Sequence, residues 1–343
     1  MPRRKSSARD FWVVVGLMLM LALPAWLTLR TVQSPRLLVP VDTDPTPYGY
    51  TWSLLLFIIP VLAIGWKVLT LRESVAEKKA FWLTVALLIP AGCGLDVVFG
   101  MSFFTFHNKA ATLGWNLPGY VWGQGFQQAI PVEEFAFYAF GFVAILLAYV
   151  WADKVWMKAY RPEDQPLLQR KPGSGTRWPA VGDAFMDSRV GPLVVGALLF
   201  GLAWLIKRHG PENSRSGIPG YFLFIVATNV VPSAFCFRVA ARLINWRAFG
   251  FSFSFIFLIS LFWEATLGVP YQWWGYQPAQ MMGLFVRAFC DLPLEAVLIW
   301  VFANWTTVLV YETILFAFHI GEKRFWRVLF FSDEELRQLR QEG

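Results

Sequence analysis

Long apolar runs separated by short polar loops make up most of the chain. A run of about 20 apolar residues is long enough to cross the hydrocarbon core of a bilayer as an α-helix. Candidate runs begin near Phe11, Thr51, Phe81, Ala129, Val190, Pro219, Phe251 and Val286. The first run is long for a signal peptide and no clean small-residue cleavage site follows it, so we count it as a span. The pattern predicts an all-α, polytopic membrane helical bundle with about eight transmembrane helices.

A polar linker at 153–189, which contains proline and glycine, interrupts this pattern between the fourth and fifth runs. It separates a first predicted membrane repeat, 1–152, from a second, 190–343, and each repeat has four runs. Because an even number of spans returns the chain to its starting side, the two halves face the same way. This organisation is that of a parallel repeat.

Lysine and arginine determine the predicted orientation. They gather at the amino terminus and in alternate loops, which the positive-inside rule places in the cytoplasm. The exceptions on the opposite side are Lys207, Arg208 and Arg215. We therefore expect an integral protein of the plasma (inner) membrane with both termini cytoplasmic.

Composition supports the membrane class and excludes several others. Of the 343 residues, 56% are hydrophobic and 15% are charged, whereas a soluble domain averages about 25% charged residues. The net charge of +7 comes mainly from loop residues, so we expect the lipid bilayer and no nucleic acid as a partner. Cys93, Cys236 and Cys290 form no Cys-x-x-Cys pair. Because the histidines lack the spacing of a metal site and no dinucleotide-binding glycine motif occurs, we expect no metal and no cofactor.

Two apolar runs begin with matching acidic motifs. "AIPVEEFAFYAF" in the fourth run aligns with "DLPLEAVLIWVF" in the eighth, which pairs Pro131 with Pro293 and Glu133 with Glu295. A proline at a helix start loses no hydrogen bond, and an acid in the first turn lies at the positive end of the helix dipole. A single such acid is usually a cap. Because ionised groups in hydrocarbon are costly, their duplication favours a functional role.

A second pair of acids precedes these motifs. Asp96 near the end of the third run aligns with Glu264 near the end of the seventh. In the predicted topology all of these carboxyl groups approach the same face of the bilayer. They could line one cavity shared by the two halves.

The halves differ in charge around the motif. Glu134 has no acidic counterpart, because Ala296 occupies the aligned position. Arg287, Asp291 and Glu295 are spaced at i, i+4 and i+8, which on a helix would align them on one face. We therefore expect the second half to hold an ionised acid beside a cation and the first half to hold a neutral one. Two acids in different protonation states are what an acid–base mechanism needs.

Aromatic loops precede both acid-bearing helices. Tryptophan and tyrosine commonly form belts at membrane interfaces, and their ring faces also attract cations when water is excluded. The aromatic residues expected to line a cationic reaction are Trp115, Trp122, Trp273, Trp274 and Tyr276.

The duplicated Pro-x-Glu motif, preceded in each half by an acid and an aromatic loop, resembles the membrane-integral lycopene cyclase family. This is the flavin-independent type, found as paired small subunits in some bacteria and as fused domains in archaea and fungi. The resemblance covers roughly residues 90–150 and 255–315. "PVEEF" fits the Pro-Leu-Glu-Glu motif of the family, whereas "PLEAV" keeps only its first Glu.

The resemblance implies proton-catalysed cyclisation of the ψ-end of a carotenoid such as lycopene. An acid protonates a terminal double bond, the cation closes onto a neighbouring alkene, and a base removes a proton to leave a β- or ε-ring. No net redox change occurs. The implied catalytic residues are Glu133, Glu134 and Glu295, with Asp96, Glu264 and Asp291 as supporting acids.

Three other functions fit parts of this pattern. Water could capture the same cation, which would make the protein a carotenoid hydratase. Parallel repeats with intramembrane acids also occur in proton-coupled transporters, although the acids here lie near span ends. Finally, a structural or assembly subunit would use the acids only to cap its helices.

Overall fold

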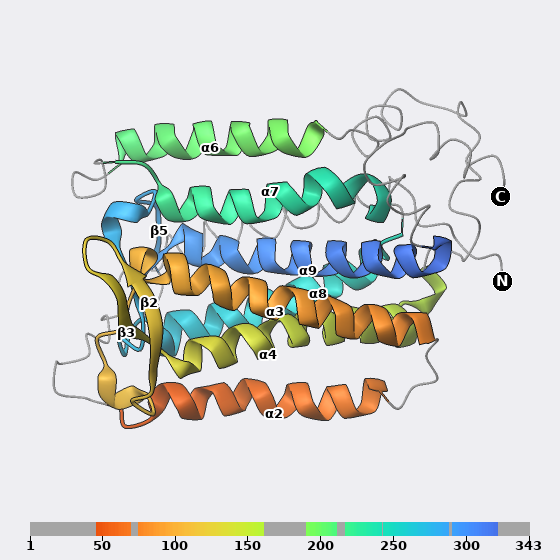
Figure 1. The fold of residues 1–343 in the computed structure, drawn as a ribbon, viewed down its shortest axis with the longest axis horizontal. Helices are drawn as coiled ribbons and strands as arrows, with labels where there is room; N and C mark the ends of the chain where they lie inside the picture. The colour runs from red at the N-terminus through yellow and green to blue at the C-terminus, as the bar shows by residue number, and fades with distance from the viewer. Residues whose placement is uncertain are drawn as a thin grey trace.

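The computed structural model describes residues 46–69, 75–160, 190–210, 217–241, 243–287 and 290–321. The run expected from Phe11 and most of the linker at 153–189 lie outside the described residues. The long helices are α2 (Gly49–Leu69), α3 (Val75–Phe103), α4 (Val132–Trp151), α6 (Gly191–His209), α7 (Gly220–Ala240), α8 (Trp246–Trp263) and α9 (Leu294–Ile320). Figure 1 shows these helices side by side with their axes running in the same general direction.

Six helices of the described chain are long and apolar enough to cross a membrane. Their spans are Glu77–Phe103, Val132–Trp156, Gly191–His209, Gly220–Ala240, Trp246–Gly268 and Leu294–Ile320. Two of these spans end in a π-helical turn, η2 (Ala152–Trp156) after α4 and η5 (Glu264–Gly268) after α8. The chain is therefore mostly helical and an integral membrane protein, as its hydrophobic pattern predicts.

Short strands occupy one end of the bundle (Figure 1). The strands are β1 (Phe104–Thr105), β2 (Asn116–Val121), β3 (Gly125–Pro131), β4 (Gly275–Tyr276), β5 (Phe285–Arg287) and β6 (Asp291–Pro293). β2 pairs with β3 and β5 with β6 as antiparallel hairpins, while β1 pairs with β4 from the other half of the chain. Turns η1 (Lys109–Ala111) and η6 (Pro278–Gln280) precede the two hairpins.

These hairpins correct two expectations from the sequence. The fourth helix begins at Val132, three residues after Ala129, and the eighth begins at Leu294 and not near Val286, because Ala129 and Val286 both lie in strands. Pro131 and Pro293 keep the backbone extended, with ψ of 143° and 144°, so each helix begins at the following residue.

The expected helical alignment of Arg287, Asp291 and Glu295 is also wrong. Arg287 and Asp291 are cross-strand partners in β5 and β6, and of the three only Glu295 lies on a helix. Strand geometry places these residues at the end of the bundle, so the helical spacing rule does not apply to them.

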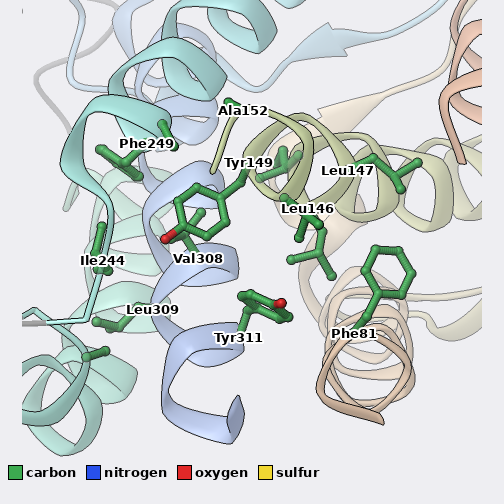
Figure 2. Close-up of a cluster of buried hydrophobic side chains, with 14 of the residues drawn as sticks. Phe81, Leu146, Leu147, Tyr149, Ala152, Ile244, Phe249, Val308, Leu309 and Tyr311 are labelled. Carbon is green, nitrogen blue, oxygen red and sulfur yellow. The ribbon is translucent and has the colours of Figure 1, made fainter. Parts of the chain in front are cut away.

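Among the six membrane-length helices, the spans of α4 and α9 are the most buried. Figure 1 shows α9 in the middle of the bundle and α4 between α3 and α2. α4 packs against α2, α3, α8 and α9, while α9 also packs against α3, α7 and α8. Figure 2 shows side chains such as Tyr149, Val308 and Phe249 meeting in this central core. By contrast, α3 and α6 expose large apolar residues such as Trp82 and Leu198, as contact with lipid requires.

Candidate functional site

Each acid-bearing helix follows a loop-to-helix junction of the same geometry. The helix-capping residues Pro131 and Pro293 have φ of −59° and −60°. Directly after each proline, the first helical amide donates at 2.9 Å to the carbonyl oxygen of the residue just before the first strand of the hairpin. Val132 donates to Trp115, and Leu294 donates to Leu284. The duplicated proline motif thus encodes a duplicated local structure.

Both first glutamates of the motif turn their side chains toward the preceding loop. Glu133 accepts hydrogen bonds at Oε1 from the Leu113 amide at 2.7 Å and from Thr51 Oγ1 at 2.6 Å. Glu295 accepts at Oε1 from the Met282 amide at 2.5 Å. Neither carboxylate lines the central cavity.

A cavity of about 100 Å³ lies inside the bundle at the hairpin end. α4 contributes lining residues from Glu134 to Ile145, a stretch of about 16 Å along a helix axis. The other walls include Tyr50 of α2, Tyr221 of α7 and Ile299 of α9. The space is mostly apolar and reaches from the helix ends into the bundle.

Two carboxylates line this cavity, Glu134 and Glu264. Glu134 accepts a hydrogen bond from the Tyr50 hydroxyl at 2.8 Å. Glu264 accepts two, from the Tyr276 hydroxyl at 2.7 Å and from Trp300 Nε1 at 2.5 Å. None of the described residues that line the cavity is basic. The two acids are therefore held by neutral donors.

Aromatic rings surround these acids in a connected set. Trp263 and Trp274 have ring centroids 4.8 Å apart, and Tyr50 lies 5.1 Å from Trp274. Phe137 contacts Trp263 at 5.3 Å and Trp300 edge-on at 5.2 Å. Electron-rich faces in a dry site stabilise a nearby cation.

Asp96 lies close to this site but does not line the cavity. Its Oδ1 accepts from the hydroxyl of Tyr138, a lining residue, at 3.5 Å. Its Oδ2 is buried and has no hydrogen-bond partner in the described structure. Tyr138 and Trp300 occupy aligned positions of α4 and α9, so Tyr138–Asp96 and Trp300–Glu264 are matching contacts.

Burial affects two titratable groups in the loop between η5 and α9. Desolvation, and next the nearby charge of Glu264, raise the pKa of Tyr276 well above its usual value. The Tyr276 hydroxyl therefore stays protonated and remains a donor. Burial, with Glu264 and Asp291 nearby, raises the pKa of the Cys290 thiol to about 12. Cys290 is consequently not a nucleophile at neutral pH.

The five aromatic residues predicted to line a reaction site lie in three different environments. Trp274 and Tyr276 line the cavity. Trp273 is buried beside it and stacks on Tyr50, with centroids 6.1 Å apart. Trp115, just before β2, is 72% exposed, and Trp122, in the turn between β2 and β3, is 73% exposed. Neither lines the cavity.

Asp291, expected as a supporting acid, is exposed at the start of β6. Its place on the hairpin follows from the strand pairing described above. It does not line the cavity.

Sequence reasoning missed several residues of the cavity wall. They are Tyr50, Phe137, Tyr138, Tyr221, Trp263 and Trp300. One signal was present, because Gly49-Tyr50 and Gly220-Tyr221 repeat the same dipeptide at the starts of α2 and α7. The others are ordinary aromatic residues of apolar helices, and only packing distinguishes them.

No family model, curated protein or solved structure matches this chain. The resemblance to lycopene cyclases therefore stays a prediction from the motifs. Across the described ranges, no three His, Cys, Asp or Glu side chains gather as a metal site would require.

Proposed function

We propose that this chain is a membrane-embedded acid–base enzyme that isomerises the linear ψ-end of lycopene, or of a similar carotenoid, to a β- or ε-ionone ring. The observation that carries the proposal is the pair Glu134 and Glu264 within one aromatic, mostly apolar cavity. A hydrocarbon substrate offers no polar handle, so the site must supply proton donor, proton acceptor and cation stabilisation itself.

The two acids suit different steps. Glu264 accepts two hydrogen bonds and Glu134 accepts one, and hydrogen bonds to a carboxylate stabilise its charged form. We therefore assign Glu134 as the proton donor and Glu264 as the base. The proton adds to the terminal double bond, a carbon–carbon bond closes the ring, and Glu264 removes a proton from a ring carbon. Return of that proton from Glu264 to Glu134 restores the enzyme, so atoms and electrons balance.

The walls stabilise the intermediate. A carbocation is electron-deficient, and a nucleophilic oxygen beside it would capture it. The ring faces of Trp263, Trp274 and Phe137 offer negative electrostatic potential without such an oxygen. The Glu264 carboxylate provides the compensating charge. A mostly apolar wall also disfavours water, which supports ring closure over hydration.

Substrate entry requires movement of the wall. The cavity of about 100 Å³ is smaller than typical ligand pockets, which begin at about 300 Å³. We infer that aromatic side chains of the wall rotate outward when a carotenoid end enters.

The finer architecture is part of the same proposal: two parallel repeats, 1–152 and 190–343, in the plasma membrane, with both termini cytoplasmic. Three matches between the two halves support the repeat. The two junctions share their geometry, and α2 and α7 begin with the same Gly-Tyr pair. Helix pairs also correspond, since α2 packs on α4 as α7 packs on α9, and α3 on α4 as α8 on α9.

The deciding experiment expresses the chain in a bacterium that accumulates lycopene and analyses its pigments by chromatography. We expect cyclic carotenoids from the wild type and a loss of about 100-fold or more in Glu134→Gln and Glu264→Gln, because acid–base groups contribute about 10²–10⁴-fold. Asp291→Asn, an exposed acid on a hairpin, is the matched control and should retain activity. Unchanged lycopene in cells with well-expressed wild type would overturn the proposal, and hydroxylated acyclic products would identify a hydratase.

A further inference from the structure

Glu133 and Glu295 make the same hydrogen bond at equivalent places. Each accepts the amide of the residue just before a glycine with positive φ, Gly114 at 77° and Gly283 at 86°. Each bond joins the first turn of a long helix to the loop that leads into its hairpin. Both glutamates therefore tie the start of a helix to the loop that precedes its hairpin.

Neither side chain is placed to touch a substrate in the cavity. Glu133 is 2% exposed and Glu295 is 0% exposed, and neither lines the cavity. In both residues Oε1 holds the loop amide while Oε2 is buried and has no hydrogen-bond partner within the described structure. Their backbone hydrogen bonds join them to the loops, and the second bond of Glu133 joins it to Thr51 of α2.

We propose that Glu133 and Glu295 are positioning residues, which hold the two loops so that the cavity acids and their donors are aligned. The proposal rests on the proposed function. It assigns these two motif acids a different role from the catalytic one expected from the sequence. Proton transfer then belongs to Glu134 and Glu264.

In the first half, the positioning acts through two adjacent contacts between α2 and α4. Thr51 donates to Glu133 at 2.6 Å, and its neighbour Tyr50 donates to Glu134 at 2.8 Å. Because Tyr50 and Thr51 are consecutive, as are Glu133 and Glu134, the Thr51 bond fixes how α2 and α4 meet. Loss of the Glu133 acceptor should therefore misalign Tyr50 with the proton donor.

In the second half, the same task involves α6. Lys207 is fully buried, and its Nζ donates to the carbonyl oxygens of Ala279 at 2.7 Å and Met281 at 2.8 Å. Glu295 holds the next amide, that of Met282. Met281 in turn packs with Tyr221 and Tyr276, and Tyr276 donates to Glu264. The loop thus connects Glu295 with Glu264, the proposed base, through intervening residues.

The test compares glutamine with alanine at each position. Glutamine keeps a carbonyl oxygen that can accept the loop amide but cannot transfer protons as a carboxylic acid does. Alanine removes the acceptor. We expect Glu133→Gln and Glu295→Gln to retain at least about one third of ring formation. The alanine variants should lose about tenfold or more, because leaving a buried amide without its acceptor carries a penalty of about 5–150-fold. Glu134→Gln is the control that loses activity despite the same substitution.

A second readout does not depend on activity. Hydrogen–deuterium exchange of the full chain in lipid nanodiscs should show about tenfold faster exchange at Leu113 in Glu133→Ala, with Met282 unchanged, and the reverse in Glu295→Ala. The glutamine variants should keep wild-type protection. If the wild type forms no rings, the proposed function fails, and these exchange rates still decide the positioning role. Glutamine variants as inactive as Glu134→Gln with normal exchange, or alanine variants with unchanged exchange, would overturn it.

Discussion

At the scale of single residues, neighbouring glutamates in one motif have different environments. Successive helical residues are rotated by about 100°. In α4 this rotation directs Glu133 to the loop amide and Glu134 to the cavity. Chemical identity alone therefore does not determine which acid can meet a substrate. The position of each acid in the helical turn determines which one lines the cavity.

Tyr50→Phe and Tyr276→Phe each remove one hydroxyl donor and keep the ring that lines the cavity. We expect ring formation to fall about tenfold in each, because an acid loses a buried partner. Tyr271→Phe is the matched control, since in the described structure its hydroxyl is not among the donors to Glu134 or Glu264, and its ring packs on the neighbouring Trp273. Product yields per membrane-inserted protein would measure the effect. Equal losses in all three variants would contradict a specific role for the donors.

At the scale of elements, the loop-to-helix junction is the unit that the chain repeats. Its proline stops the helix from extending backward, and its glycine turns the chain in a conformation that side chains disfavour. The hairpin then returns the backbone to the helix start. The resulting geometry brings an acid of the first turn within reach of a loop amide.

Gly114→Ala and Gly283→Ala test this unit. Both glycines have positive φ, where a Cβ costs about 1–2 kcal/mol, so each substitution should lower the free energy of unfolding by about that amount. Gly94→Ala in α3 should act in the opposite direction, because a Cβ there meets no neighbour and alanine favours the helix by about 0.5–1 kcal/mol. Denaturant titration in mixed micelles would measure all three. A Gly114→Ala protein as stable as Gly94→Ala would contradict the assigned junction geometry.

At the scale of the whole molecule, the acids gather at the hairpin end of the bundle. The hydrophobic pattern and the basic loops place this end on the outer face of the membrane in the proposed topology. The opposite end carries lysines such as Lys154, which pairs with Glu77 at 3.1 Å. The arrangement puts the cavity within the bundle, close to its hairpin end.

Labelling with a membrane-impermeant maleimide tests this orientation. Trp122→Cys, on the exposed hairpin, should react in intact cells. Lys158→Cys, in the 3₁₀ turn at the opposite end of α4, should react only after permeabilisation. The wild type, with its three native cysteines, provides the background. The reverse pattern would show an inverted protein.

The sequence by itself determined the membrane class, the approximate positions of the helices and the duplicated junction. These features depend on local properties: the apolar length needed to cross a bilayer, the missing amide of Pro131 and Pro293, and the spacing of the acids after them. The matching φ and ψ of the two prolines follow directly from that local chemistry.

Only the tertiary structure decided which residues share the cavity. Tyr50 lies far from Glu134 in the chain and meets it only because α2 packs on α4. Trp300 likewise meets Glu264 only because α8 packs on α9. The hairpin that replaces the expected helix at Val286 likewise depends on pairing between β5 and β6. Contacts between distant segments follow from how helices fit together across a shared interface, and no local pattern in the sequence specifies that fit.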